Sequence, residues 1–236
     1  MQIVINHLTR MQPGNMCVAG IDLATGRLVR PVWGSNLRTK NLVRHGGVFD
    51  IGCVVDLGWT QHCGERPHVE DFRFKPERAR VVETWPPETF WKLLEQHARP
   101  TLAEIFGPEL TPRGQRSCAI DRGRGRVSLG CLRLSGTAHL YVGHRAGRPH
   151  KVRIAFSDGR FDVDVGVTDI RLYGADHVTP NVDLVSHTAE RLQRSRDVIL
   201  SVGLTRAFTS SDEYPPLHWL QVNNLHFAEE ACWQLG

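Results

Sequence analysis

Two alternating runs near the end of the chain constrain its fold more than any other feature. Residues 198–206 read VILSVGLTR and residues 218–227 read HWLQVNNLHF, with a proline-containing loop between them. Successive side chains of a strand point to opposite faces, so the first run has one apolar face and one face of mostly small residues. In the second run, Leu220 and Val222 are separated from Trp219, Gln221 and Asn223. We therefore predict two strands, the second with a ring and two carboxamides on one face.

The face that carries Trp219 has two interpretations. An aromatic ring and two amides are ordinary surface residues of a strand, and Trp219 would then cover a small secondary core. Alternatively, the face binds a ligand, because Gly203 on the preceding strand allows a backbone or a ligand to come close. Arg206 follows at the end of that strand. Neither observation names a ligand.

Composition indicates an ordinary soluble globular protein. The chain has 236 residues, of which 41% are hydrophobic and 23% charged, and no apolar run approaches the roughly 20 residues that cross a bilayer. Residues 1–10 (MQIVINHLTR) lack the basic start and apolar centre of a signal peptide. We therefore predict a cytoplasmic protein with no membrane partner. The net charge of +4 favours an anionic partner.

The cysteines do not indicate a metal site. Six cysteines are scattered without CxxC spacing, so buried thiols are expected rather than disulfides or metal ligands. His62, Cys63 and His68 lie close together in the sequence, but a structural zinc site needs about four ligands at recognisable spacing. We predict no metal and no other cofactor.

Short strands and one helical insert are predicted for the first half. Apolar runs at 2–8, 16–22, 27–33, 48–58 and 68–74, separated by turn residues, are typical of a small sandwich or barrel. Pro31 cannot donate a ladder hydrogen bond, which places Arg30 near a strand end. After Pro86-Pro87, the helical spacing of Phe90, Leu93, Leu94 and His97 predicts a helix, and Thr101 with Glu104 forms a capping box for a second one.

An arginine-rich and glycine-rich segment follows at residues 111–126 (TPRGQRSCAIDRGRGR). We place a domain boundary here, with 1–112 as an N-terminal OB-like domain that includes the helical insert and 113–236 as a C-terminal OB-like domain. The segment is either a flexible cationic arm or a linker kept soluble by its charge. Sequence-independent phosphate contacts need only exposed arginines, which makes Arg122 and Arg124 candidates for such contacts.

The second half also reads as β structure. Strands are predicted over 127–134, 138–143, 151–156 and 161–172, and Asp158 with Gly159 predicts a hairpin turn because this pair supplies the positive φ of a tight turn. The basic run at 144–153 extends a cationic surface or faces solvent. Asp162 and Asp164 on the adjacent strand argue against a purely cationic face. A short helix is expected over 186–194.

Several segments, in order, resemble a known family: MCVAGIDLATGRLVRPVW at 16–33, HVED at 68–71, and the late VILSVGLTRAF with HWLQVNNLHF. From residue 2 to about 227 the chain resembles the bacterial dual OB-containing domain family. The resemblance implies a mainly β fold of two tandem OB-like small barrels, and OB folds commonly bind single-stranded nucleic acid. The matching positions are Arg30, His68, Asp71, Gly203, Arg206, His218, Trp219, Gln221 and Asn223.

We accordingly predict a nucleic-acid-binding protein that contacts single-stranded DNA or RNA through basic loops and a strand face. Trp219 would stack on a base. Trp33 and Trp59 are further candidates for stacking. The predicted binding residues are Arg30, Arg122, Arg124 and Arg206 for phosphate, Trp219 for stacking, Gln221 and Asn223 for hydrogen bonds to base or sugar, and His218 on the same strand.

Two alternatives stay open. One is a nucleotide-processing hydrolase that uses His68 with Asp71, or His218, as acid and base. His68 and Asp71 would face opposite sides of a strand unless a bulge intervenes, and the chain has no P-loop, GxSxG elbow, HExxH or dinucleotide fingerprint. We therefore expect a binding protein rather than an enzyme. The other alternative is a sensor or scaffold that recognises a nucleotide or a partner protein without turnover.

Overall fold

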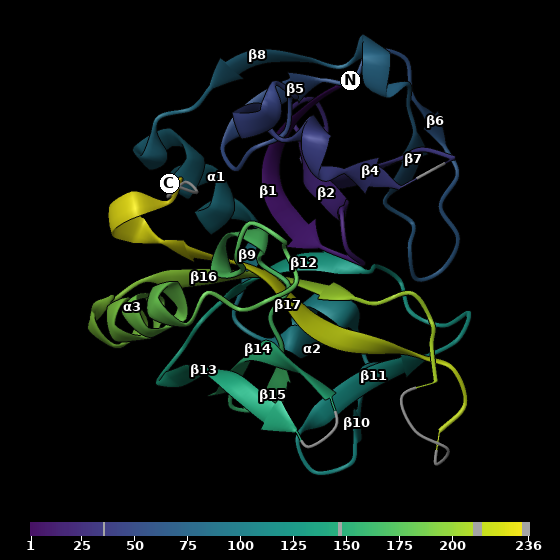
Figure 1. Ribbon diagram of the computed structural model, residues 1–236. Helices are drawn as coiled ribbons and strands as arrows, with labels where there is room; N and C mark the ends of the chain where they lie inside the picture. The colour runs from purple at the N-terminus through teal and green to yellow at the C-terminus, as the bar shows by residue number, and fades with distance from the viewer. Residues whose placement is uncertain (35, 146–147, 210–213, 233–236) are drawn as a thin grey trace.

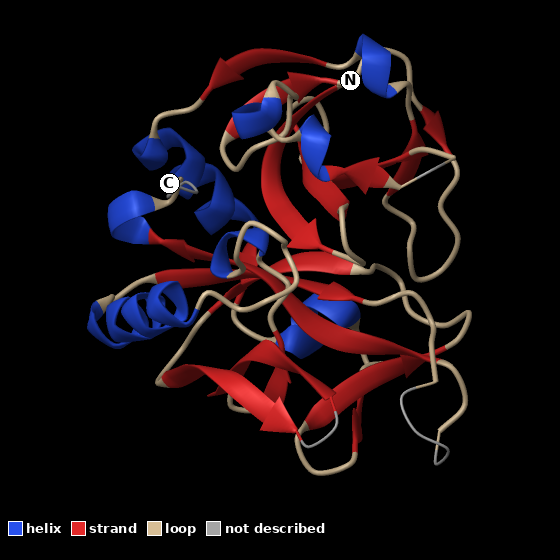
Figure 2. Ribbon diagram, in the orientation of Figure 1, coloured by secondary structure: helices blue, strands red, loops and turns tan. Residues whose placement is uncertain are grey.

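Two curled β units lie against each other, with two longer helices at one side and a short one among the strands of the lower unit (Figures 1 and 2). The computed structural model describes residues 1–34, 36–145, 148–209 and 214–232. The chain is mainly β, and its curled sheets have the form of OB-like barrels. The predicted fold class is therefore confirmed.

The first unit is an eight-stranded sheet in the order β6-β7-β3-β2-β1-β5-β8, with β4 against β2. β3 and β7 are parallel neighbours. Short 3-10 helices η1 (Thr39–Asn41), η2 (Val43–His45) and η3 (Pro76–Arg78) connect strands. The strands are β1 (Gln2–Arg10), β2 (Asn15–Asp22), β3 (Leu28–Val32), β4 (Leu37–Arg38), β5 (Cys53–Asp56), β6 (Gln61–His62), β7 (Asp71–Arg73) and β8 (Arg80–Thr84).

A bulge in β1 decides which residues face the second unit. The register of β1 with β2 shifts between Ile5 and His7. In a regular strand these two residues would share a face, whereas the extra residue turns His7 to the face opposite Ile5. Ile5 packs in the core of the first unit, and His7 contacts Asn223 of the second.

The helical insert forms as predicted. Helix α1 (Pro87–His97) has a proline in its first turn and buries Phe90, Trp91 and Leu94. Helix α2 (Leu102–Phe106) begins after Thr101, whose hydroxyl accepts a hydrogen bond from the Glu104 backbone at 3.2 Å. Between the two helices, β9 (Ala98–Arg99) pairs in parallel with β12 (Leu129–Arg133) of the second unit.

The second unit contains a six-stranded sheet in the order β10-β11-β17-β16-β12-β9 and a three-stranded sheet β13-β14-β15. Gly159 has a φ of 82° in the β14–β15 turn, which confirms the predicted hairpin. Helix α3 (Val182–Arg194) packs beside β13 and starts four residues earlier than predicted, because the Asn181 side chain caps it. The remaining elements are β10 (Thr111–Arg113), β11 (Ser117–Asp121), β12 (Leu129–Arg133), β13 (Ala138–Arg145), β14 (Arg148–Ser157), β15 (Asp162–Gly166), η4 (Ile170–Leu172), β16 (Val198–Leu204), β17 (Leu217–Phe227) and η5 (Ala228–Glu230).

Four local predictions differ from the structure. The strand expected over 48–58 is limited to β5, and the one expected over 161–172 ends at Gly166, before η4. The first part of the segment expected to be a flexible arm or linker, residues 111–121, instead forms the β10–β11 hairpin, which the Arg113–Asp121 ion pair spans at 2.9 Å. The strand expected over 68–74 is limited to β7, because residues 67–70 form turns that follow Pro67.

The cores of the two units interlock at their junction. Leu102, Ile105 and Phe106 of α2 pack in the core of the second unit, ahead of the predicted boundary. Conversely, Cys131 and Ile199 of the second unit pack in the core of the first. A division at 112–113 stays a prediction, and in the folded chain hydrophobic contacts cross it in both directions.

Candidate functional site

A buried ion pair lies where the two units meet. Arg30 on β3 donates from Nε to Asp71 Oδ1 at 2.6 Å, and its Nη2 lies 2.9 Å from Nδ1 of His68. The same Nη2 donates to the hydroxyl of Ser128 at 3.2 Å. Arg30 is only 5% exposed. The prediction that Arg30 presents its charge to a phosphate at a strand end is therefore corrected, because its guanidinium is buried and bonded within the protein.

The proton position on His68 follows from this ion pair. A guanidinium can only donate, so Nδ1 of His68 accepts and the proton of the neutral ring lies on Nε2. Burial and then the charges of Arg30 and Arg206 lower the pKa of His68 to about 2, which keeps the ring neutral. Its Nε2 lies 3.2 Å from Nδ1 of His218.

The Nδ1 of His218 also lies 2.9 Å from the carbonyl of Thr205, which can only accept a hydrogen bond. The Nε2 of His218 is buried and has no hydrogen-bond partner among the described residues. His218 was predicted to lie on the binding surface, but it is buried and contacts His68 of the first unit.

Three side chains of the HVED segment reach the second unit. His68 contacts His218, and Glu70 accepts from the backbone and hydroxyl of Ser128 at 2.8 Å each. Burial raises the pKa of Glu70. Asp71 accepts from Arg206 at 2.5 Å on the oxygen that Arg30 leaves free. His68 and Asp71 are thus joined through Arg30, which lies between them.

A second polar group fixes β1 against β17. The Nδ2 of Asn223 lies 3.0 Å from Nδ1 of His7, and its Oδ1 accepts from Gln221 at 2.8 Å. The neighbouring Asn224 exchanges two hydrogen bonds with the backbone of Leu8. Asn223 is buried, so the amide predicted to read a base instead joins the two units. Gln221 is only partly buried.

The side chain of Asn223 occupies the space beside Gly203. A Cβ added at Gly203 would lie 2.6 Å from Nδ2 of Asn223. The close approach that this glycine allows is therefore that of a side chain on the paired strand, rather than that of a ligand.

Three aromatic rings gather at the start of β17, which we call the ring cluster: Phe208, Tyr214 and Trp219. The centroids of Tyr214 and Phe208 lie 5.8 Å and 6.5 Å from that of Trp219. The indole Nε1 of Trp219 donates to the carbonyl of Phe208 at 3.2 Å. Trp219 is half-buried, and Phe208 is 47% exposed. Sequence reasoning missed Phe208 and Tyr214 because they lie in a loop with no periodic pattern.

Arginines lie at the same end of β17 as the ring cluster. Ala119 of β11 pairs with Trp219 and Asp121 with Leu217, so the loop with Arg122 and Arg124 starts beside the first residue of β17. Both arginines are exposed. The backbone of Thr205 donates to the carbonyl of Trp219, which places Arg206 next to it. Arg206 keeps 58% of its side chain exposed despite its ion pair.

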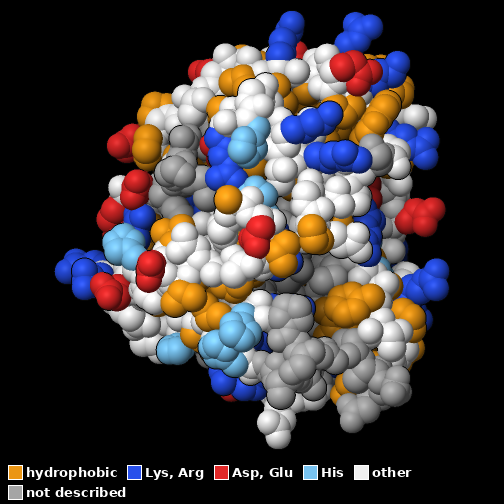
Figure 3. All heavy atoms as spheres, in the orientation of Figure 1, with side chains coloured by type: hydrophobic (Ala, Val, Ile, Leu, Met, Phe, Trp, Pro, Cys, Tyr) orange, Lys and Arg blue, Asp and Glu red, His pale blue; other side chains and the backbone are white. Residues whose placement is uncertain are grey.

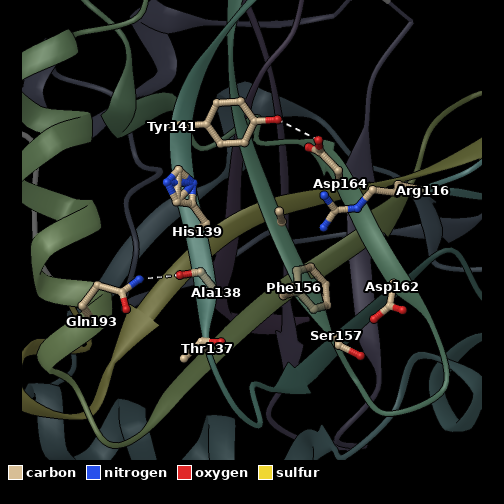
Figure 4. A pocket seen from close by; sticks show the side chains of 11 residues that line it. Arg116, Thr137, Ala138, His139, Tyr141, Phe156, Ser157, Asp162, Asp164 and Gln193 are labelled. Atoms are coloured by element: carbon tan, nitrogen blue, oxygen red, sulfur yellow. Dashed lines mark hydrogen bonds between the residues drawn. The ribbon is translucent and has the colours of Figure 1, made fainter.

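A cavity of about 560 Å³ lies on the outer face of β13, β14 and β15 (Figure 4). Tyr141 and Asp164 point toward each other there, and the phenol donates to the carboxylate at 2.7 Å. Asp162, Asp164 and Arg116 line the cavity, and Asp164 also pairs with Arg153 at 3.0 Å, so the lining offers no excess of cations to a polyanion. The tip of the predicted basic run, at 145–149, lies outside the described side chains.

Other basic side chains are spread over the molecule. Figure 3 shows Lys and Arg distributed over the upper part of one face rather than gathered into one stripe. Within the described ranges, no group of three or more His, Cys, Asp or Glu residues is arranged to hold a metal ion. His62 instead contacts the carbonyl of Val69 at 2.8 Å. None of the helices in the described part of the chain has both the length and the apolar character to span a membrane.

A search of curated proteins found no match to this chain. The family model of the dual OB-containing domain, in contrast, matches residues 1–225, which include both units and every polar contact between them described above. Because this match spans nearly the whole sequence and the sheets curl as OB-like barrels do, the chain belongs to the dual OB-containing domain family.

Proposed function

We propose that this protein binds single-stranded nucleic acid at the ring cluster, with Arg122, Arg124 and Arg206 contacting the phosphates. The observation that supports this is the position of partly exposed rings between a loop and a strand end that both carry exposed arginines. Proteins that bind single strands combine stacking rings with cations along the backbone of the strand. The family supports the same function, since OB folds commonly bind nucleic acid.

The charge around Arg206 suits a phosphate. Arg30 and Arg206 share the single carboxylate of Asp71, so these three side chains together carry one net positive charge. Arg30 is buried, and the accessible part of that charge lies on Arg206. A phosphate beside the ring cluster would therefore meet a guanidinium that Asp71 holds in place but does not neutralise.

The predicted residues then divide into two groups. Trp219 with Phe208 offers ring surface for stacking, and Gln221, which is partly exposed, offers hydrogen bonds to a base or sugar. Arg30, His218 and Asn223 act indirectly, because their contacts hold the two units together and thereby set the position of Arg206 and β17.

The cysteines support a location in the cytoplasm. All six are free thiols, and burial raises the pKa of Cys131 and Cys232 to about 12, which keeps both protonated. Unpaired thiols are typical of a reducing compartment. We therefore infer a cytoplasmic protein.

A titration panel tests the proposal. Labelled single-stranded DNA, single-stranded RNA and duplex DNA of about 16 nucleotides are titrated at about 50 and 200 mM salt. We expect single strands to bind more tightly than the duplex, and binding to weaken with salt. Arg122→Gln with Arg124→Gln should reduce the salt slope by about 0.7 for each lost phosphate contact. Equal affinity for single strands and duplex, or an unchanged salt slope in the double variant, would contradict single-strand binding at this surface.

A further inference from the structure

A cation-lined cavity lies on the first unit, away from the junction. Its volume is about 550 Å³, and it is lined by Asp56, Gly58, Trp59, Lys75, Arg78 and Arg80. These residues come from the end of β5 and the turn after it, from the region of η3, and from the start of β8. β5 and β8 are labelled near the N-terminus in Figure 1. None of the lining residues belongs to the ring cluster or contacts it in the described structure.

The turn after β5 presents Trp59 to solvent. The carboxylate of Asp56 accepts a hydrogen bond from the backbone of Gly58 at 2.9 Å, and Gly58 has a φ of 68°, which favours glycine. The next residue, Trp59, is 64% exposed. This exposed indole lines the cavity.

The remaining lining is strongly basic. Arg80 pairs with Asp56 at 3.0 Å. The backbone N–H of Gly58, and then the N-terminal ammonium and Arg80, lower the pKa of Asp56, which stays ionised. Lys75 and Arg78 are exposed and make no ion pair with the described residues. The cavity thus has three cations against one carboxylate, or a net charge of +2.

We propose that this cavity is a nucleotide-binding site, in which Trp59 stacks on the base and Lys75 and Arg78 bind the phosphate. An exposed indole beside unpaired cations matches the two chemical parts of a nucleotide, since a base has a π face and a phosphate carries the negative charge. An acidic peptide would use the cations but would leave the face of the indole without a matching group. The ligand is either a free nucleotide or one residue of a single strand.

Calorimetry with ATP and with inorganic tripolyphosphate tests this site in the full chain. We expect ATP to bind more tightly than tripolyphosphate, because only ATP has a base. Trp59→Ala should weaken ATP binding about 5-fold to 150-fold, the range for loss of one stacked base, and leave tripolyphosphate binding unchanged. Lys75→Gln with Arg78→Gln should weaken both ligands. Matched controls are Trp33→Ala, another exposed indole, and Arg27→Gln with Lys92→Gln, two exposed cations outside the cavity.

A second comparison distinguishes a free nucleotide from one residue of a single strand. It compares Trp219→Ala, in which the ring cluster is impaired, with the double variant that also carries Trp59→Ala. Loss of residual single-strand binding on adding Trp59→Ala would identify a strand residue as the ligand, whereas an effect confined to ATP would identify a free nucleotide. The proposal is overturned if the wild-type chain binds neither ATP nor a single strand at Trp59. It is also overturned if Trp59→Ala and Trp33→Ala bind these ligands with the same affinity. These tests measure the contribution of Trp59 alone. They can therefore fail while the ring cluster still binds a strand, and the ring cluster can fail to bind a strand while Trp59 still binds a nucleotide.

Discussion

The Nε2 of His68 lies 3.2 Å from the Nδ1 of His218, although 150 residues separate them in the sequence. This contact belongs to a chain of hydrogen bonds that starts at Asp71 and passes through Arg30 to both histidines. Arg206, on the accessible side of Asp71, is the end of the network that a ligand can reach. The stability of the junction and the position of the proposed binding surface are thus connected through one carboxylate.

Acid should destabilise the fold through its buried histidines. Burial is the main cause that lowers the pKa of His7 and of His226 to about 3 and that of His68 to about 2. Their folded pKa values lie below the unfolded value of about 6.5, so the unfolded chain binds more protons as the pH falls. The stabilisation is fully present above about pH 6.5 and is lost progressively toward pH 3.

Each of the three histidines should contribute about 1.4 kcal/mol per pH unit in that window. Urea unfolding at pH 7 and pH 5.5 should therefore show a free energy of unfolding that is lower by roughly 3–4 kcal/mol at the lower pH. Equal stability at the two pH values would mean that the rings are not buried in the neutral form.

Two arginines on the same carboxylate should differ in their contribution to stability. Arg30→Ala leaves His68 and the Oδ1 of Asp71 buried without their partner, while Arg206 still bonds to Oδ2, and should cost about 3–5 kcal/mol of unfolding free energy. Arg206→Ala removes a largely exposed partner of Asp71 and should cost no more than about 1 kcal/mol. Urea denaturation of both variants measures the difference. Similar costs for the two would contradict the burial of the Arg30 ion pair.

Gly203 should be intolerant of a methyl group. In Gly203→Ala the new Cβ would lie 2.6 Å from Nδ2 of Asn223, so the amide that contacts His7 must move. We expect a loss of about 1–3 kcal/mol, as for other overpacked buried sites. Gly166→Ala is the matched control, because nothing lies within 4 Å of a Cβ at that strand position. Thermal unfolding of the two variants should separate them, and equal midpoints would count against the packing described at Gly203.

Local patterns predicted much of the fold. The alternation in residues 198–206 and 218–227 gave the positions of β16 and β17, and the Asp158-Gly159 pair gave the β14–β15 turn. Helix α1 followed from apolar spacing and its proline. In each case neighbours in the sequence determine the conformation.

The candidate site was harder to predict because it depends on contacts between distant segments. Pro31 predicted that Arg30 lies near a strand end, whereas β3 continues to Val32, and its parallel pairing with β7 buries that arginine against Asp71. The bulge before His7 leaves no mark in the sequence pattern, and it alone turns His7 toward Asn223. The rings of Phe208 and Tyr214 approach Trp219 from an irregular loop, which periodicity cannot describe.

The central claim is that the ring cluster binds a single strand. Fluorescence anisotropy with a labelled single strand at about 50 mM salt, comparing the wild-type chain with Trp219→Ala and Trp33→Ala, tests it most directly. Loss of the stacked base should weaken binding by about 1–3 kcal/mol in Trp219→Ala, while Trp33→Ala, which removes an exposed indole outside the cluster, should bind as the wild type does. An unchanged affinity in Trp219→Ala, with the fold intact, would contradict the account.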